Sequence, residues 1–138
     1  QRLSSPSKPW YLVKYQRIFM KTLISIILLM SFNAQAVYLS HCSNYSKELE
    51  YSFSSCINSN FSEIGRKLTG VYLSNCYSFN KEIDYSFTSC VQNNFSTISR
   101  KLTGLYLSYC SNYSKEVESS YVYCIQGNFS DIQRKLNK

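Results

Sequence analysis

The sequence predicts an all-α protein made of three tandem 34-residue repeats that follow an export signal. Three observations lead to this prediction. The chain matches itself at an offset of 34 residues, apolar residues inside each repeat are spaced three and four apart, and a short apolar segment precedes the first repeat. Repeats of fixed period stack so that each unit buries its apolar face against its neighbours. We therefore expect a short solenoid of helical hairpins.

The first 36 residues are expected to lie outside this repeat domain. Residues 1–19 hold both prolines and the single Trp, and we do not expect them in the mature protein. Residues 20–36 contain one Lys, an apolar core at 23–30 and the small-residue site Ala34-Gln35-Ala36, which is the order of a signal peptide. A spanning helix needs about 20 apolar residues, so we expect cleavage rather than a membrane anchor.

Removing this leader changes the charge of the protein. The whole chain has 15 basic and 8 acidic residues, a net charge of +7. Five basic residues and no acidic residue lie in the leader, which leaves the repeat domain with a net charge of only +2. Nucleic-acid binding is therefore not expected. Stable membrane insertion of the mature chain is not expected either, because interfacial helices combine an exposed apolar face with clear positive charge.

The repeats run from 38 to 71, from 72 to 105 and from 106 to 138. Each opens with Tyr-Leu-Ser-x-Cys, carries Lys-Glu five residues after that Cys, and has a second Cys fourteen residues after the first. Each also contains the motif Asn-Phe-Ser-x-Ile-x-Arg-Lys-Leu. A match of this length over three copies makes the repeat the main signal in the chain.

Within the first repeat the apolar spacing predicts two helices, over 45–57 and 61–69. The pattern is interrupted before Asn60, which would then act as the N-cap of the second helix, with Glu63 completing a capping box. Asn94 and Asn128 are the equivalent residues of the other repeats. Gly70 and Gly104 follow the second helix and suit a left-handed C-terminal position.

All six cysteines lie in the repeats, and in an exported protein they are expected to form disulfides. Two residues fourteen apart on one straight helix would be about 21 Å apart, too far for a bridge. Pairing within a repeat therefore needs the first Cys in an extended segment that folds back, and it gives all three units the same geometry. The alternative joins neighbouring units, Cys56 to Cys76 and Cys90 to Cys110. The within-repeat pairs, which we expect, are Cys42 with Cys56, Cys76 with Cys90, and Cys110 with Cys124.

The sequence contains no pattern that predicts catalysis or a cofactor. His41 is the single His, and its counterparts are Asn75 and Tyr109, so a central general base or metal ligand is not expected. There is no Cys-x-x-Cys or Cys-His cluster of the kind that binds zinc. We expect a protein without enzymatic activity, metal or cofactor.

A basic pair closes each repeat, and these pairs are the candidate partner-binding residues. Cations are favoured at helix C-termini, so one interpretation is purely structural. The other is a ladder of three basic pairs, suited to an acidic protein face or an anionic glycan. The pairs are Arg66 with Lys67, Arg100 with Lys101, and Arg134 with Lys135.

The aromatic residues divide into a repeated set and a surplus set. Helical spacing assigns most of the repeated set to the core. That set comprises Tyr38, Tyr72, Tyr106, Tyr45, Phe79, Tyr113, Phe61, Phe95 and Phe129. The surplus set is suited to a recognition surface, because amphipathic rings are enriched at interfaces. It comprises Tyr51, Tyr77, Tyr85, Tyr109, Tyr121 and Tyr123.

Each repeat also has a Cys, a Glu before a second Cys, and an apolar helix that ends in Leu and Tyr. In the first unit these residues are Cys42, Glu48, Cys56, Ile64, Leu68 and Tyr72. In this order the repeat resembles the LprI-type family of small exported lysozyme-inhibitor-like proteins. The resemblance implies an exported compartment and inhibition of a lysozyme-like enzyme. The 34-residue period is also similar to that of tetratricopeptide and Sel1-like arrays, which implies a helical-hairpin solenoid.

These features together predict a secreted or periplasmic binding protein without enzymatic activity. It would inhibit a lysozyme-like, cell-wall-degrading enzyme or contact a host protein, and the sequence leaves its oligomeric state open. The alternative is a membrane-active helical protein held together by disulfides.

We predict that the mature protein begins at Val37, because Ala-Gln-Ala precedes this residue and the first repeat starts one residue later. The intact mass of the exported protein measures this directly. A membrane-embedded product that retains Met20–Ala36 would contradict both the export signal and the expectation of disulfides.

Overall fold

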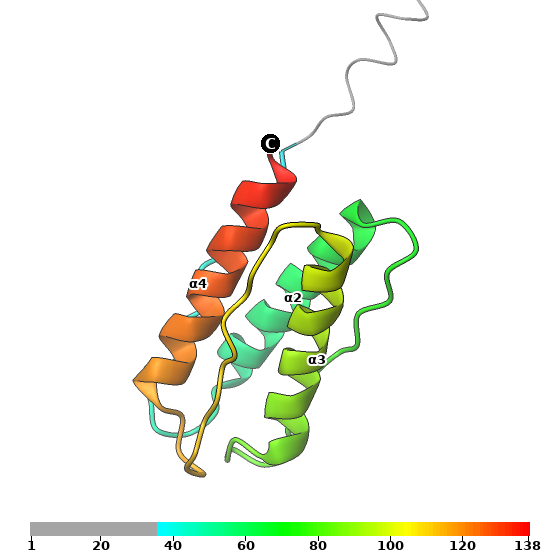
Figure 1. The fold of residues 1–138 in the computed structure, drawn as a ribbon. Coiled ribbons are helices and arrows are strands. Elements are labelled where there is room, and N and C mark those ends of the chain that lie inside the picture. Colours follow the sequence, from blue (N-terminus) through cyan, green and yellow to red (C-terminus); the bar gives the residue numbers. More distant parts are fainter. Residues whose placement is uncertain (1–35) are drawn as a thin grey trace, which may run out of the picture. The chain divides into compact units, whose positions relative to one another are not determined.

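The computed structural model describes residues 36–138, which contain three α-helices and no strand. The helices are α2 (Tyr51–Lys67), α3 (Tyr85–Lys101) and α4 (Ser119–Leu136). They run in the same direction, and between them the chain returns as extended segments (Figure 1). The all-α class and the three disulfide-bearing repeats are thus confirmed. Residues 1–19 and the predicted signal peptide, apart from Ala36, lie outside the described residues.

Each repeat holds one long helix, so the predicted helical hairpin is wrong. The helix begins at Tyr51 in the first repeat and continues without interruption through Asn60. Residues 38–50, part of which was predicted as helix, are extended or form turns. The polar residues Asn58 and Asn60, at the predicted interruption, instead hydrogen-bond to the returning extended segments, whereas Ser59 between them is exposed. Asn60 is therefore not an N-cap, and Glu63 pairs with Arg66 rather than completing a capping box.

The buried Asn of each helix holds the extended segment of its own repeat. Asn60 accepts a hydrogen bond from Ser40 N–H and donates one to Ser40 C=O, both at 2.8 Å. Its Nδ2 also lies 3.3 Å from Cys42 Sγ. Asn94 makes the same pair of bonds to Ser74, at 2.9 and 2.7 Å, and Asn128 makes them to Ser108, both at 2.8 Å. One side chain thereby satisfies both backbone groups of a segment that has no sheet partner.

A second polar contact ties each extended segment to the preceding helix. Asn58 of α2 accepts from Cys76 N–H at 2.7 Å and donates to Cys76 C=O at 2.8 Å. Gln92 of α3 accepts from Cys110 N–H at 3.1 Å. Gln126 of α4 donates to the carbonyl of Cys42, in the first repeat, at 2.6 Å. Each extended segment is therefore hydrogen-bonded to two helices.

The repeats close into a ring instead of extending as an open array. In each repeat a loop joins the extended segment to the helix, and a backbone N–H in one such loop donates to a Lys carbonyl in the loop of the next repeat. The loop of the third repeat bonds back to the loop of the first. These bonds run from Leu49 to Lys81, from Ile83 to Lys115 and from Val117 to Lys47, at 2.6, 2.9 and 2.7 Å. The predicted short solenoid is therefore not an open one, since the bond from Val117 to Lys47 joins the third repeat to the first.

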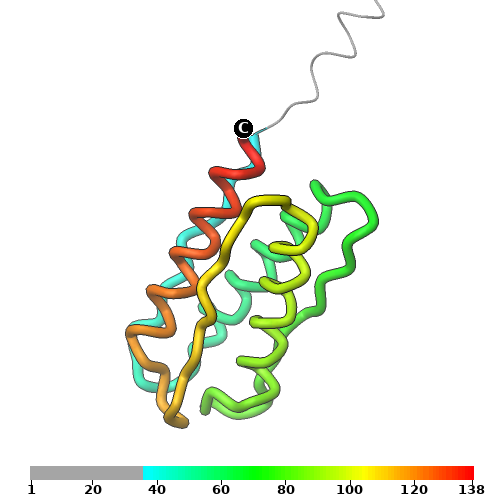
Figure 2. Tube along the Cα trace, in the orientation of Figure 1, coloured from blue at the N-terminus to red at the C-terminus, as the bar shows by residue number. Residues whose placement is uncertain are grey.

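The two ends of the described chain meet at the closure of this ring. Val37 N–H donates to Asn137 Oδ1 at 2.7 Å, and Asn137 Nδ2 donates to the Val37 carbonyl at 2.9 Å. Leu39 N–H donates to Gln133 Oε1 at 2.7 Å. Figure 2 shows residues 36–42 running alongside α4. The first extended segment thus fills the position between α4 and α2 that the equivalent segments fill between the other helices.

The core lies on the axis of the ring. Phe61, Phe95 and Phe129 pack edge to face, with ring centroids 5.3 Å apart in every pair. Around them lie the buried apolar residues of each helix and of the extended segments. They include Leu39, Phe53, Ile57, Ile64, Phe87, Val91, Ile98, Tyr121, Ile125 and Ile132. Edge-to-face packing of this kind adds stability beyond the area buried.

Helices α2 and α3 are each followed by the predicted left-handed residue. Gly70 and Gly104 both have a φ of +75°, which a side chain would make unfavourable. Leu68 and Leu102, two residues earlier, close the last turns through bonds to Ile64 and Ile98. The chain then reverses into the next extended segment.

We predict that Asn94→Ala lowers the free energy of unfolding by about 1–3 kcal/mol, because it leaves the Ser74 backbone groups without partners. Urea unfolding monitored by circular dichroism measures the change. Asn93→Ala, at the exposed neighbouring position of α3, is the control and should change stability little. Equal effects of the two substitutions would contradict the role assigned to the buried Asn.

We predict that Tyr121→Phe stabilises the protein by about 1 kcal/mol, since the buried Tyr121 hydroxyl has no hydrogen-bond partner. Burial also raises the pKa of this phenol. The first two repeats carry Phe53 and Phe87 at the same position, so the ring fits. The reverse changes, Phe53→Tyr and Phe87→Tyr, should destabilise in the same unfolding experiment, and a loss of stability in Tyr121→Phe would show that the hydroxyl has a partner.

Candidate functional site

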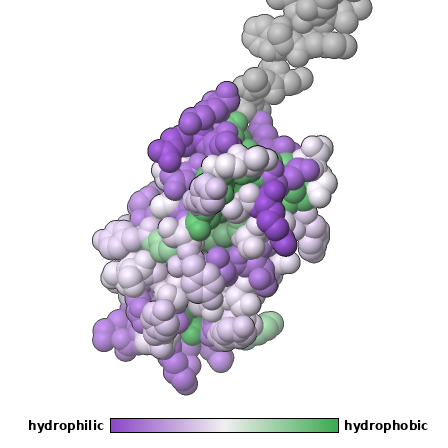
Figure 3. Space-filling view, viewed as in Figure 1, coloured by the Kyte–Doolittle hydropathy of each residue, from purple (hydrophilic) through white to green (hydrophobic). Residues whose placement is uncertain are grey.

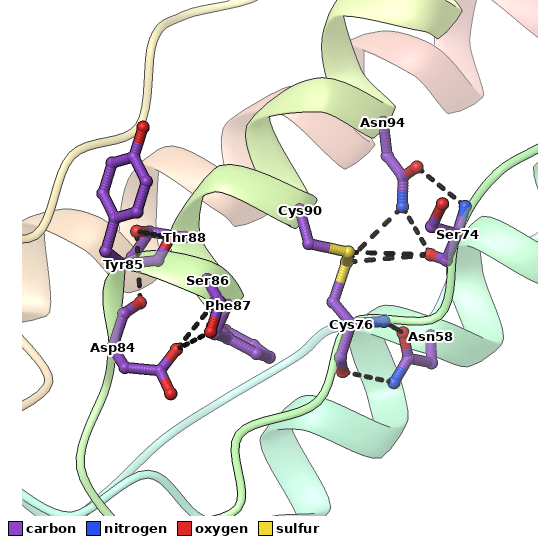
Figure 4. The surroundings of a disulfide bond; sticks show 10 residues. All are labelled: Asn58, Ser74, Cys76, Asp84, Tyr85, Ser86, Phe87, Thr88, Cys90 and Asn94. Atoms are coloured by element: carbon purple, nitrogen blue, oxygen red, sulfur yellow. Dashed lines mark hydrogen bonds between the residues drawn. A yellow bond between two sulfur atoms is a disulfide. The ribbon is translucent and has the colours of Figure 1, made fainter.

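The three disulfides make the scaffold rigid. They join Cys42 to Cys56, Cys76 to Cys90 and Cys110 to Cys124, with Cα–Cα distances of 5.5, 5.6 and 5.6 Å. The predicted pairing within repeats is therefore confirmed, and it has the predicted geometry of an extended segment folded back on its helix. Figure 4 shows the second bridge beside the clamp that Asn94 forms on Ser74. A surface built on this frame loses little conformational freedom when it binds.

Most of the repeated aromatic residues are exposed, so their assignment to the core is wrong. Phe61, Phe95 and Phe129 are buried as predicted, because they lie on the helices. The other six lie in the extended segments and loops, where the spacing of a helix does not apply, and they point outward. They are Tyr38, Tyr72, Tyr106, Tyr45, Phe79 and Tyr113, and Phe79 is 99% exposed.

The surplus tyrosines divide differently. Tyr121 is fully buried and replaces the core Phe of the other repeats. The remaining five are exposed, by 60% or more, and are available to a partner. They are Tyr51, Tyr77, Tyr85, Tyr109 and Tyr123. On the face drawn in Figure 3, the strongly hydrophobic residues are visible only as small patches between polar residues.

The predicted basic pairs all lie in the last turn of their helices. Arg66 pairs with Glu63, and Arg134 Nη2 lies 2.7 Å from Asp131 Oδ1. Arg100, whose repeat has Thr97 in place of the acid, donates to the Thr97 hydroxyl at 3.2 Å. Because the helices are parallel, the pairs form a cluster at one end of the bundle rather than a ladder along it. We call this surface the basic end.

The fold separates charge between the two ends of the bundle. The basic end carries seven basic and two acidic residues, a net charge of +5. They are Arg66, Lys67, Arg100, Lys101, Arg134, Lys135 and Lys138, with Glu63 and Asp131. The opposite end is formed by the three loops that precede the helices. It carries three basic and six acidic residues, a net charge of −3. They are Lys47, Lys81 and Lys115, with Glu48, Glu50, Glu82, Asp84, Glu116 and Glu118. A net charge of +2 for the whole domain conceals this separation.

The loop end carries a ring of ion pairs around the axis. Each Lys reaches a Glu of a neighbouring repeat: Lys47 to Glu116, Lys81 to Glu48 and Lys115 to Glu82, all at 3.1 Å. These six residues and Phe79 line an open depression of about 650 Å³. The pairs are largely exposed, so each is worth little in stability. Their charges are mutually compensated, which leaves the ring without a preference for an anion or a cation.

The described residues contain no arrangement typical of a metal centre. His41 is exposed, and within residues 36–138 no three His, Cys, Asp or Glu side chains are grouped as metal ligands. No helix in this range is long and apolar enough to cross a membrane.

Comparisons with protein-family models, with curated proteins and with solved structures find no match to this chain.

Proposed function

We propose that the protein is an exported, non-enzymatic binding protein that attaches to an anionic partner through its basic end. The observation that carries the proposal is the separation of charge by the parallel helices. Six of the seven basic residues of this end recur in every repeat at the same position, although the residue just before each pair changes from Gly65 to Ser99 and Gln133.

Exposed charges of this kind act mainly on the rate at which two molecules associate. A surface with a net charge of +5 on one end of a small rigid domain attracts an acidic protein face or an anionic glycan, and salt screens the attraction. Helix C-termini contribute in the opposite direction, because their carbonyls carry partial negative charge. The positive charge of the basic pairs is larger than the negative charge of their two acidic neighbours and of these carbonyls. This excess supports a role beyond stabilising the helix ends.

The three disulfides support the exported location, because disulfides persist in oxidising compartments. No cysteine among the described residues is free. A membrane-active protein would need a continuous apolar face beside its positive charge. The exposed aromatic residues are instead distributed over all three repeats. We therefore favour a binding protein over a membrane-active one.

Inhibition of a lysozyme-like enzyme is the second candidate, carried by the family resemblance of residues such as Cys42, Glu48 and Cys56. The loop end, with a net charge of −3, has the sign that a basic lysozyme would require. An activity assay of an animal lysozyme with added wild-type protein tests this candidate, and unchanged lysozyme activity removes it.

We predict that the combined variant Arg66→Glu, Arg100→Glu and Arg134→Glu weakens binding to heparin, used as the anionic probe, by at least about tenfold at low salt, with a smaller difference at high salt. Calorimetric titration measures affinity. The matched control is Lys47→Glu, Lys81→Glu and Lys115→Glu, which changes the net charge equally at the loop end.

Helicity by circular dichroism must be retained in both variants. Stability should change only by about 0.3–1 kcal/mol for each exposed charge. If the two variants bind heparin equally well, the basic end is not the binding surface and the proposal fails.

A further inference from the structure

Five exposed tyrosines do not follow the repeat. Tyr51 and Tyr85 align with Ser119, and Tyr77 aligns with Ser43 and Ser111. The remaining alignments pair Tyr109 with Asn75 and His41, and Tyr123 with Ser55 and Ser89. In sequence they are scattered over different positions of the unit. In the structure four of the five line depressions at the junctions between repeats: Tyr51 at one junction, Tyr85 and Tyr109 at the next, and Tyr123 at the last.

Two of these junctions form open grooves lined by aromatic rings. The first, which we call the α3 groove, lies between α3 and the extended segment of the third repeat, and has a volume of about 360 Å³. Its rings are Tyr85, Tyr109 and Tyr113. The second, the α4 groove, lies between α4 and the segment of the first repeat, with about 270 Å³. Its rings are Tyr45, Tyr123 and His41.

The two grooves occupy equivalent positions in the ring, and two of their three rings come from the same positions of the repeat: Tyr113 aligns with Tyr45, and Tyr109 with His41. The third ring comes from different positions. The α4 groove has Ser119 where the α3 groove has Tyr85, and it has Tyr123 where the α3 groove has Ser89. One ring is thus lost and another gained on the same helix face. The exchange keeps one tyrosine ring on the helix side of each groove.

Both grooves are uncharged. No Lys, Arg, Asp or Glu lines either of them. The depression at the third junction, by contrast, extends to Glu48, Glu50 and Lys81. The uncharged lining excludes a polyanion, whose recognition needs cationic side chains, and single-stranded nucleic acid for the same reason.

Polar groups with fixed orientation complete each groove. The side-chain oxygen of Gln92 accepts a hydrogen bond from Cys110 N–H, so the N–H groups of its side-chain amide remain available to a ligand. The side-chain amide nitrogen of Gln126 donates a hydrogen bond to the Cys42 carbonyl, so its side-chain oxygen remains available as an acceptor. Each helix therefore offers an anchored amide beside exposed rings. A groove of this volume, near the lower limit of about 300–1,000 Å³ for ligand sites, holds a small unit of a longer chain.

We propose that the α3 groove and the α4 groove are two binding sites for uncharged oligosaccharides. A pyranose ring has a face of C–H groups that stacks on an aromatic ring, and an edge of hydroxyl groups that both donate and accept hydrogen bonds. The grooves present these two chemistries side by side and present no charge. A proline-rich peptide also docks on aromatic grooves, but proline lacks an N–H to use the free acceptor of Gln126.

Two sites on one rigid domain also suit a repetitive polysaccharide. A chain that reaches both grooves binds the second at high effective concentration, which raises its apparent affinity without new contacts. The sites are separate from the basic end, so this inference does not depend on the anionic partner proposed above.

The groove variants use substitutions that the protein itself carries at equivalent positions, so the fold should tolerate them. Tyr85→Ser with Tyr109→Asn removes two rings from the α3 groove, and Tyr123→Ser removes one from the α4 groove. The control is Tyr72→Ser with Tyr106→Ser, two tyrosines that are equally exposed but line neither groove. The probes are cellohexaose, mannohexaose and the hexamer of N-acetylglucosamine, titrated calorimetrically.

We expect at least one of these probes to bind wild-type protein at two sites, with an affinity that salt does not change. The variant with Tyr85→Ser and Tyr109→Asn should lose one site. The variant that also carries Tyr123→Ser should bind at least about tenfold more weakly than the wild type, the factor that corresponds to about 1.4 kcal/mol. The control should bind like the wild type. The basic-end variant should also bind these sugars normally, and the groove variants should bind heparin normally.

Absence of binding by all three sugars at millimolar concentration overturns the proposal, as does binding that the groove variants leave unchanged. Binding of a polyproline peptide that the groove variants abolish, without sugar binding, would assign the grooves to that other ligand and also overturn it. Loss of heparin binding alone in the basic-end variant would leave the groove proposal standing.

Discussion

The rest of the structure depends on the hydrogen bonds that a buried Asn in each helix makes to the extended segment of its own repeat. Its carboxamide bonds to both the N–H and the C=O of one Ser in the extended segment, for Asn60 on Ser40, Asn94 on Ser74 and Asn128 on Ser108. An extended segment with no neighbouring strand would otherwise leave these groups unpaired close to the core, which is costly. The same side chain contacts the sulfur of the disulfide, so the hydrogen bonds and the covalent bridge hold one segment on one helix.

Because each segment returns along its helix, the next helix starts at the same end as the one before it, and all three run parallel. Parallel helices place like helix ends together. Acidic residues sit at the N-cap positions Glu50, Asp84 and Glu118, and basic pairs sit in the last turns, as the helix dipoles favour. A domain with little net charge thereby acquires one positive and one negative end, which is the physical basis of the proposed anionic partner.

The ring arrangement also explains why so many aromatic side chains are exposed. The axis of the ring has room for three Phe rings and the residues around them, and these positions are filled from the helices. Tyrosines of the extended segments alternate with buried neighbours, as Tyr38 does between Val37 and Leu39, and so point outward. They leave the sides of the bundle rich in rings and free of charge between two charged ends. Binding by the sides and binding by the basic end are therefore separable properties of one scaffold.

The sequence by itself determined the repeat, the helical class and the left-handed Gly70 and Gly104, because each of these follows from local spacing that recurs along the chain. It favoured disulfides within the repeats but left pairing between neighbouring repeats open. It could not determine that Asn60 lies inside a helix, since a helix-capping Asn and a buried clamping Asn look alike until the partner segment is in place. Nor could it show the ring closure, the clustering of the basic pairs or the grooves at Tyr85 and Tyr123. Those depend on contacts between residues of different repeats, such as Val117 with Lys47. Only the tertiary structure decided them, because the direction in which one repeat packs on the next is set by hydrogen bonds that span the repeats.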